Sequence, residues 1–206
     1  MTSKEMRENP LFMRNNFNSV GKWGFALNKK QNIDLNNIQL IASSNIKTND
    51  TEENKQKGVH HYVDDYRFNS LYDHPEKSLK RYSQYKFLIL PEYSTFADMD
   101  LWRQIESTGK NRWVGAYWQS HGLLVVPAIC WSTPRSYEFC FDAVERGSVV
   151  AVGMIECKKQ KKLFLYGYDA MLERINPSAI IILGSPFTEM RGNIIPVKYS
   201  YNGGNC

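Results

Sequence analysis

Four short apolar runs constrain the fold of this chain more than any other feature. They read KFLILP, LLVVPAICW, SVVAVGM and AIIILG, at residues 86–91, 123–131, 148–154 and 179–184. Each run is continuous rather than alternating, which is typical of strands that are buried on both faces of a sheet. Segments with helical character separate the runs, and strand–helix–strand repetition implies right-handed crossovers. The sequence therefore predicts an α/β fold with a mainly parallel sheet.

Three segments carry the helical signal, at residues 74–85, 98–106 and 163–175. A late segment at 194–199 could add a further strand, and Pro196 would place that strand at an edge of the sheet. About six strands are too few for a complete eightfold barrel, which needs roughly 250 residues. We therefore expect an open or incomplete, TIM-like barrel.

The composition changes along the chain and divides it into three parts. Residues 1–58 are rich in Asn, Lys, Thr and Glu, and we expect them to hold a short strand at 38–42 and a mobile loop at 43–58. Residues 59–199 should form the α/β body, and residues 200–206 should be a disordered tail.

Overall composition limits the class of protein. With 206 residues, 42% hydrophobic and 23% charged, the chain fits one globular core. No apolar run reaches the roughly 20 residues of a membrane-spanning helix, so we expect a soluble, cytoplasmic protein with no membrane partner. The net charge of +5 divides into +3 through Gly58 and +2 from Val59, and it marks no binding face.

Several common catalytic signatures are missing from the sequence. It holds no GxxxxGK[ST] loop, no GxGxxG after a strand, no GxSxG elbow and no HExxH helix. The four cysteines form no CxxC pair and the histidines add no zinc spacing, so we expect reduced thiols and no structural zinc. A nucleophilic Cys130 would need a base partner that the sequence does not reveal. His60 and His61 are neighbours, so in a strand one of them should face the core.

Polar residues at the carboxyl ends of the predicted strands are the candidates for a functional site, because parallel sheets bind ligands at that edge. Asp64, Asp65 and Arg67 lie at the exit of VHHYVDDYRF, and Glu92 and Ser94 follow the first apolar run.

The carboxylates among these residues could form a pair. Asp64 and Asp65 are adjacent and would point to opposite faces of a strand, so a dyad needs a partner from another strand, and Glu92 is the nearest candidate. Such a pair could act as acid and base or hold a divalent metal. Alternatively, one aspartate caps a turn and the other pairs with Arg67 or Arg112.

Five blocks of sequence in one order connect the chain to a family. They read HHYVDDYRF, LPEYSTF, GAYWQ, VPAICW and SYEFCFDA, within Val59 to Phe187. The chain resembles a family of bacterial, phage and mobile-element proteins that is described only as a domain of unknown function. In that family the second block more often reads PDFS, where this chain has Glu92, and the first more often has Phe at His61. Glutamate keeps a carboxylate there but moves it outward by about one methylene.

The resemblance implies an intracellular protein of a phage, prophage or plasmid, and it implies no reaction. The site residues that it suggests are Asp64, Asp65, Arg67, Glu92, Ser94, Arg112, Gln119, Trp131 and Ser136. In an enzyme, the three carboxylates would be the catalytic candidates and the other residues would bind the ligand.

Two kinds of function remain open from the sequence. In the first, which we slightly prefer, the protein binds a nucleic acid, a nucleotide or a host partner, in replication or in counter-defence. In the second, it is an enzyme acting on a phosphorylated or nucleotide-like substrate at a strand-end carboxylate site. There Arg67 or Arg112 would bind an anionic group and Trp131 would lie against a flat ring. No cofactor is identified, and a divalent metal at the carboxylates stays open.

Overall fold

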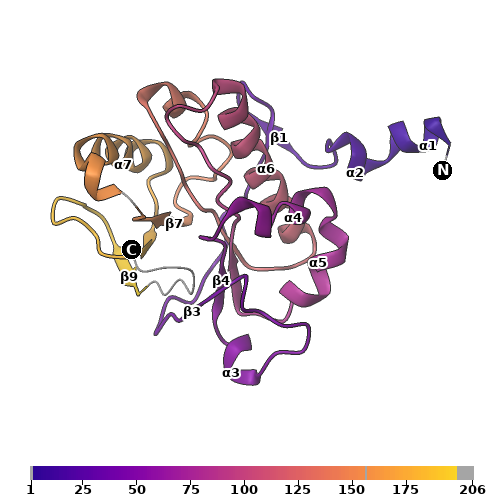
Figure 1. The fold of residues 1–206 in the computed structure, drawn as a ribbon, viewed down its shortest axis with the longest axis horizontal. Coiled ribbons are helices and arrows are strands. Elements are labelled where there is room, and N and C mark those ends of the chain that lie inside the picture. Colours follow the sequence, from indigo (N-terminus) through magenta and orange to yellow (C-terminus); the bar gives the residue numbers. More distant parts are fainter. Residues whose placement is uncertain (1, 156, 199–206) are drawn as a thin grey trace.

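The computed structural model describes residues 2–155 and 157–198. An N-terminal arm with two helices, α1 (Ser3–Glu8) and α2 (Pro10–Met13), extends away from the body of the molecule (Figure 1). A short antiparallel hairpin of β1 (Ser19–Val20) and β2 (Phe25–Ala26) follows the arm.

Parallel strands form the body, and they follow one another in chain order. A first sheet contains β3 (Leu40–Ala42), β4 (Gly58–His60), β5 (Phe87–Ile89) and β6 (Val125–Val126). A second sheet contains β7 (Val149–Gly153), β8 (Ala179–Leu183) and β9 (Ile194–Val197). A parallel bridge between Ala128 and Ala151 connects the two sheets beyond the end of β6. Strands in chain order are the arrangement of a TIM-like barrel.

The predicted α/β class with a mainly parallel sheet is thus confirmed. Within residues 2–155 and 157–198 no ladder joins β9 to β3, so the arrangement is an open one. Pro196 lies in β9, at the edge of the second sheet, as its missing N–H requires.

Helices connect successive strands. The α-helices of the body are α3 (Glu52–Lys55), α4 (Ser70–Asp73), α5 (Pro75–Tyr82), α6 (Leu101–Ser120) and α7 (Lys161–Ile175). Three turns of 3-10 helix add η1 (Asp65–Arg67), η2 (Pro134–Glu138) and η3 (Cys157–Gln160). In the described part of the chain no helix is both long enough and apolar enough to cross a membrane.

The second sheet is buried on both faces, which explains its continuous apolar sequence. Val149 and Ala151 face the core cluster that contains β4, β5 and β6, whereas Val150 and Val152 pack toward α7. Helix α7 ends where Asn176 adopts a left-handed conformation with φ 47°, a conformation that asparagine tolerates.

Helix α6 packs unusually close to the first sheet. A β-carbon at Gly115 would lie 2.1 Å from Oδ1 of Asn28 and 2.8 Å from a methyl carbon of Leu90. Only glycine lets the helix backbone approach this closely, and the approach places one side of α6 behind the carboxyl ends of β5 and β6.

One expectation was wrong: the segment VHHYVDDYRF does not continue as a strand. Strand β4 ends at His60, and the N–H of Val63 bonds to the carbonyl of His61 at 2.8 Å, which turns the chain out of the sheet. Asp65 then begins η1. The argument that Asp64 and Asp65 point to opposite faces of a strand therefore does not apply.

Residues 43–58 contain α3 and are fastened by Asp50, which accepts hydrogen bonds from Tyr85 Oη at 2.5 Å and from Asn54 Nδ2 at 2.8 Å. The mobility of this segment and the three-part division of the chain stay predictions. The predicted tail at 200–206 lies outside the described residues.

Candidate acid–base site at the strand ends

Residues from four neighbouring strand ends, three in or after the first sheet and one in the second, converge at the carboxyl ends of the strands. Tyr62 follows β4, Glu92 follows β5, Cys130 follows the β6 run, and Gly153 ends β7. Parallel neighbours end at the same edge, which is why residues 91 positions apart along the chain meet there.

Gly153 provides the space in which two of these side chains meet. A β-carbon at this position would lie 2.6 Å from Cε1 of Tyr62 and 3.4 Å from Oε2 of Glu92. A side chain at residue 153 would therefore displace Tyr62, and glycine leaves Tyr62 and Glu92 packed over the end of β7.

Glu92 has an unusual acidity for a carboxyl group. Its pKa is raised from 4.5 to about 7, mainly by burial and also by the negative charge of Asp65, while hydrogen bonding with Cys130 acts in the opposite direction. Glu92 therefore exists in both protonation states near neutral pH, which is the condition for a general acid or base.

Asp65 is held in place beside this site. Its two carboxylate oxygens accept hydrogen bonds from Ser94, at 3.0 Å from the backbone N–H and 2.9 Å from the hydroxyl. These bonds tie the η1 turn after β4 to the loop after β5, so two sequence-distant candidates are joined. Asp65 acts on Glu92 through its charge.

Apart from Asp65, the other titratable groups around Glu92 are uncharged at neutral pH. Burial and the nearby charge of Glu92 hold the pKa of Tyr62 well above its ordinary value, and the same two causes raise the pKa of the Cys130 thiol. Burial lowers the pKa of His60, the residue before the turn, to about 4, so its imidazole is neutral. The site therefore offers neutral hydrogen-bonding groups around one carboxyl that titrates.

A sequence profile described as a domain of unknown function (DUF4417) matches residues 17–201. The chain belongs to this family. The resemblance expected from the five sequence blocks is thus confirmed.

The relatives of this DUF4417 domain include two phage proteins. The Gene 1 protein of Mycobacterium phage L5 is 36% identical over 129 residues, which are 61% of this chain and 56% of the relative. The Gene 1 protein of Mycobacterium phage D29 is 35% identical over 129 residues, which are 61% of this chain and 48% of the relative. The chain thus spans about half the length of the curated relatives that it matches. No solved structure matches it.

Two residues of α6 that the sequence suggested for the site hold this helix to neighbouring segments, and one of them, Arg112, also lines a small cavity together with Glu92 and Cys130. Arg112 on α6 is buried, and its guanidinium donates to the carbonyls of Cys140 at 2.6 Å and Asp142 at 2.9 Å and to the side chain of Asn111. These bonds fasten α6 to the 140–142 segment. Gln119 lies at the C-terminal end of α6. Its side chain donates to the carbonyl of Lys29 at 2.7 Å and accepts from the N–H of Lys29 at 2.9 Å.

Two further candidates serve packing. Trp131 lies against Phe164 of α7, with ring centroids 5.0 Å apart, and Gly167 leaves room for its indole. Ser136 is fully buried and bonds within its own turn, donating to the carbonyl of Thr133 at 2.7 Å.

Asp64 and Arg67 are exposed and flank Asp65 at the η1 turn. They form an ion pair of 3.6 Å with each other, which is the pairing that the sequence offered as an alternative to a carboxylate dyad. Of the predicted catalytic carboxylates, the structure brings Asp65 and Glu92 together and leaves Asp64 on the surface.

Metal ligation has limited support at this site. Within the described residues no group of three His, Cys, Asp or Glu side chains lies close enough to share an ion. Glu92 and Asp65 are the carboxylates that could contact a cation, and both oxygens of Asp65 already accept hydrogen bonds from Ser94.

Sequence reasoning missed Tyr62 and gave Cys130 no partner. Tyr62 lies beyond the end of β4, after the turn at His61, so strand alternation did not point to it. His61 itself bonds Tyr82 Oη at 3.1 Å and the carbonyl of Ile89 at 2.7 Å. The contact between Cys130 and Glu92 joins residues 38 positions apart, and no local pattern reports it.

Proposed function

We propose that this DUF4417 domain is an enzyme that acts on a phosphorylated or nucleotide-like substrate, with Glu92 as its general acid or base. One observation carries the proposal: Glu92 sits at the carboxyl ends of parallel strands with a pKa of about 7. Buried carboxyl groups tuned toward neutrality are typical of proton-transfer sites.

The groups around Glu92 suit such a role. In its ionised form Glu92 can take a proton from a bound substrate, and in its protonated form it can return one. Tyr62 remains a hydroxyl donor, because burial and Glu92 hold its pKa high, and it could orient a substrate oxygen. The charge of Asp65 opposes ionisation of Glu92 and so favours the return of the proton after each transfer.

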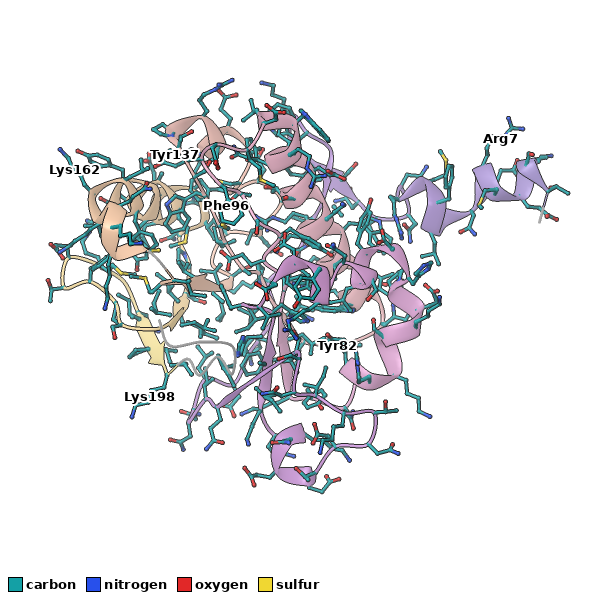
Figure 2. All side chains as sticks on the ribbon, in the orientation of Figure 1. Arg7, Tyr82, Phe96, Tyr137, Lys162 and Lys198 are labelled. Atoms are coloured by element: carbon teal, nitrogen blue, oxygen red, sulfur yellow. The ribbon has the colours of Figure 1, made fainter. Side chains whose placement is uncertain are left out.

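A lysine-rich groove supports a phosphorylated substrate. It is lined by Lys158, Lys159, Gln160, Lys161, Lys162, Leu163 and Tyr166, at the start of α7. The thiol of Cys157 lies 3.7 Å from the carbonyl of Gly153, which ties the η3 turn at the start of this groove to the end of β7. Figure 2 labels Lys162 on the outer side of α7. Lys161 is paired with Glu189 at 2.7 Å, and the other lysines would meet phosphate oxygens.

The proposal is tested by incubating the protein with a small-molecule extract of bacterial cells and following all components by mass spectrometry. We expect a phosphorylated compound to be consumed and a product to appear with the wild-type protein. Glu92→Gln should abolish the conversion, whereas Glu173→Gln, on the exposed side of α7, should leave it unchanged. Conversion by Glu92→Gln at the wild-type rate would contradict the proposal. A wild-type protein that converts no compound in the extract would contradict it as well.

A second candidate function is binding of a host protein without turnover. It is favoured by large exposed aromatic side chains on η1, on the loop after Ser94 and at the start of α6: Tyr66 at 70%, Phe96 at 63% and Trp102 at 63%. Figure 2 labels Phe96 in the loop that follows Ser94. Exposed aromatic rings of this kind, accompanied by arginines, are typical of the centres of protein interfaces.

The charge near these rings distinguishes a protein partner from nucleic acid. Asp98 and Asp100 lie between Phe96 and Trp102 in the sequence, and they would repel a phosphate backbone. We therefore expect no binding of a single-stranded 20-mer at low salt, while Trp102→Ala weakens capture of a host partner and Phe12→Ala, on the N-terminal arm, does not. Tight, salt-sensitive binding of the 20-mer would instead indicate that the protein binds nucleic acid.

A third alternative is sequestration of a nucleotide. In that case a nucleotide would stay bound to the protein and no product would appear.

A further inference from the structure

We infer that Cys130 is a positioning residue for Glu92, whose thiol donates a hydrogen bond to the Glu92 carboxylate while its sulfur accepts one from the hydroxyl of Thr95. This inference deepens the proposed function and rests on Glu92 as the acid or base. The quantity that it predicts can nevertheless be measured without any substrate.

The geometry sets the direction of this chain of hydrogen bonds. Thr95 Oγ1 lies 2.9 Å from Cys130 Sγ, and either atom could donate. Glu92 lines the same small cavity as Cys130, hydrogen bonding with the thiol lowers the Glu92 pKa, and an ionised carboxylate can only accept. The thiol proton therefore points to Glu92, and the sulfur is left to accept from the hydroxyl of Thr95, which is itself buried.

The surroundings leave little room for water to take the place of the thiol. Glu92, Thr95 and Cys130 line one small cavity together with residues of α6, and its free space is about 10 Å³. That space is close to the minimum for a single water molecule. The residues of α6 that close the cavity include Ser107, Thr108, Asn111 and Arg112.

The chemistry of the thiol agrees with a donor and disagrees with a nucleophile. Burial and the charge of Glu92 hold the pKa of Cys130 well above its ordinary value, so the proton stays on sulfur at neutral pH. Reactive cysteines have lowered pKa values instead. As a donor, Cys130 stabilises the ionised form of Glu92 and offsets part of the effect of burial and of Asp65.

Shortening the side chain of Cys130 distinguishes a hydrogen bond from burial alone, because the two explanations predict opposite changes in the Glu92 pKa. If the thiol stabilises the Glu92 carboxylate, Cys130→Ala removes the donor and the pKa of Glu92 rises. If burial alone sets that pKa, the smaller side chain admits water and the pKa falls.

The experiment is a pH titration of the full chain labelled with ¹³C at the glutamate carboxyl carbons, followed by NMR, with the Glu92 signal assigned from Glu92→Gln. We expect the Glu92 pKa to rise from about 7 to about 8 in Cys130→Ala, which corresponds to the loss of one ordinary hydrogen bond. Cys130→Ser keeps a donor and should titrate close to the wild type. Thr95→Val should raise the pKa by a smaller amount.

Two variants serve as matched controls. Cys157→Ala removes a thiol of the neighbouring η3 turn, and Thr108→Val removes a hydroxyl that lines the same cavity but donates to the carbonyl of Gln104. Both should leave the Glu92 pKa unchanged. An unchanged or lowered pKa in Cys130→Ala would overturn the inference. The proposed function fails on a different result, namely turnover by Glu92→Gln, so the two failures can be told apart.

Discussion

The two halves of the parallel sheet differ in how much of each strand is paired. Strands β3 to β6 have two or three residues each, whereas β7 and β8 have five and pair over their full length. In the first half the chain leaves the sheet early and its next residues carry polar groups to the site. In the second half, aliphatic residues fill β7 and β8 up to Gly153 and Leu183. The difference separates a half that carries most of the candidate site from a half that is buried on both faces.

The physical reason lies in the cost of burying polar groups. Tyr62, Glu92 and Cys130 need partners from neighbouring loops, and short strands free the backbone to bring those loops together. Such an arrangement contributes little apolar burial, so long, fully paired strands elsewhere must supply the stability.

The largest expected effect is on the stability of the second half. Ile180 is fully buried between β8 and α7, so Ile180→Ala should lower the free energy of unfolding by about 3 kcal/mol in urea titrations. The pKa of Glu92 should stay near 7 in this variant. Leu124→Ala, at a 39% exposed side chain, is the control and should change stability by less than about 0.5 kcal/mol. A shifted Glu92 pKa would show that the halves are not separable.

The next effect concerns the stability that the folded protein loses when the buried Glu92 ionises. The pKa of Glu92 is about 7 in the folded protein and 4.5 in the unfolded chain, so the folded state binds more protons between these values and loses stability as the pH rises. Glu92→Gln should therefore be more stable than the wild type by about 2–3 kcal/mol at pH 8. The difference should shrink as the pH falls below 7 and vanish below about 4.5. An equal advantage at pH 4.5 and pH 8 would contradict a titrating Glu92.

The smallest effect tests the core beneath the site. Burial lowers the pKa of His61 to about 3, so the folded state binds fewer protons than the unfolded chain between pH 3 and 6.5 and loses stability as the pH falls through that range. At pH 7, His61→Phe should be less stable by about 1 kcal/mol, because Tyr82 and the carbonyl of Ile89 lose their partner.

The pH dependence of this variant provides its check. As the pH falls from 6.5 to 5, the wild type should lose its advantage over His61→Phe, since the variant has no imidazole to protonate at residue 61. His60 titrates in both proteins and cancels in the difference. A stability difference between the two proteins that is constant from pH 7 to pH 5 would show that His61 is not buried in its neutral form.

Particular residues show how far the fold and the site could be predicted. The runs at 86–91, 148–154 and 179–184 contain β5, β7 and β8. They could be predicted because a strand that is buried on both faces needs a continuous run of apolar residues. Glu92 and Ser94 were found from their place after a strand. The turn at His61 was not predicted, since the β-branched and aromatic residues of this segment favour a strand. In the structure a backbone hydrogen bond from Val63 to His61 ends the strand despite that preference.

The sequence by itself determined the mainly parallel sheet, because continuous apolar runs separated by helical segments imply parallel strands with crossovers, and it predicted the carboxyl edge of that sheet as the place for a site. Only the tertiary structure decided which polar residues work together. It bound the guanidinium of Arg112 to backbone carbonyls, packed Trp131 against α7, and brought Cys130 and Asp65 to Glu92. The acidity of a carboxyl group depends on the water excluded around it and the charges near it, and both are properties of packing in three dimensions.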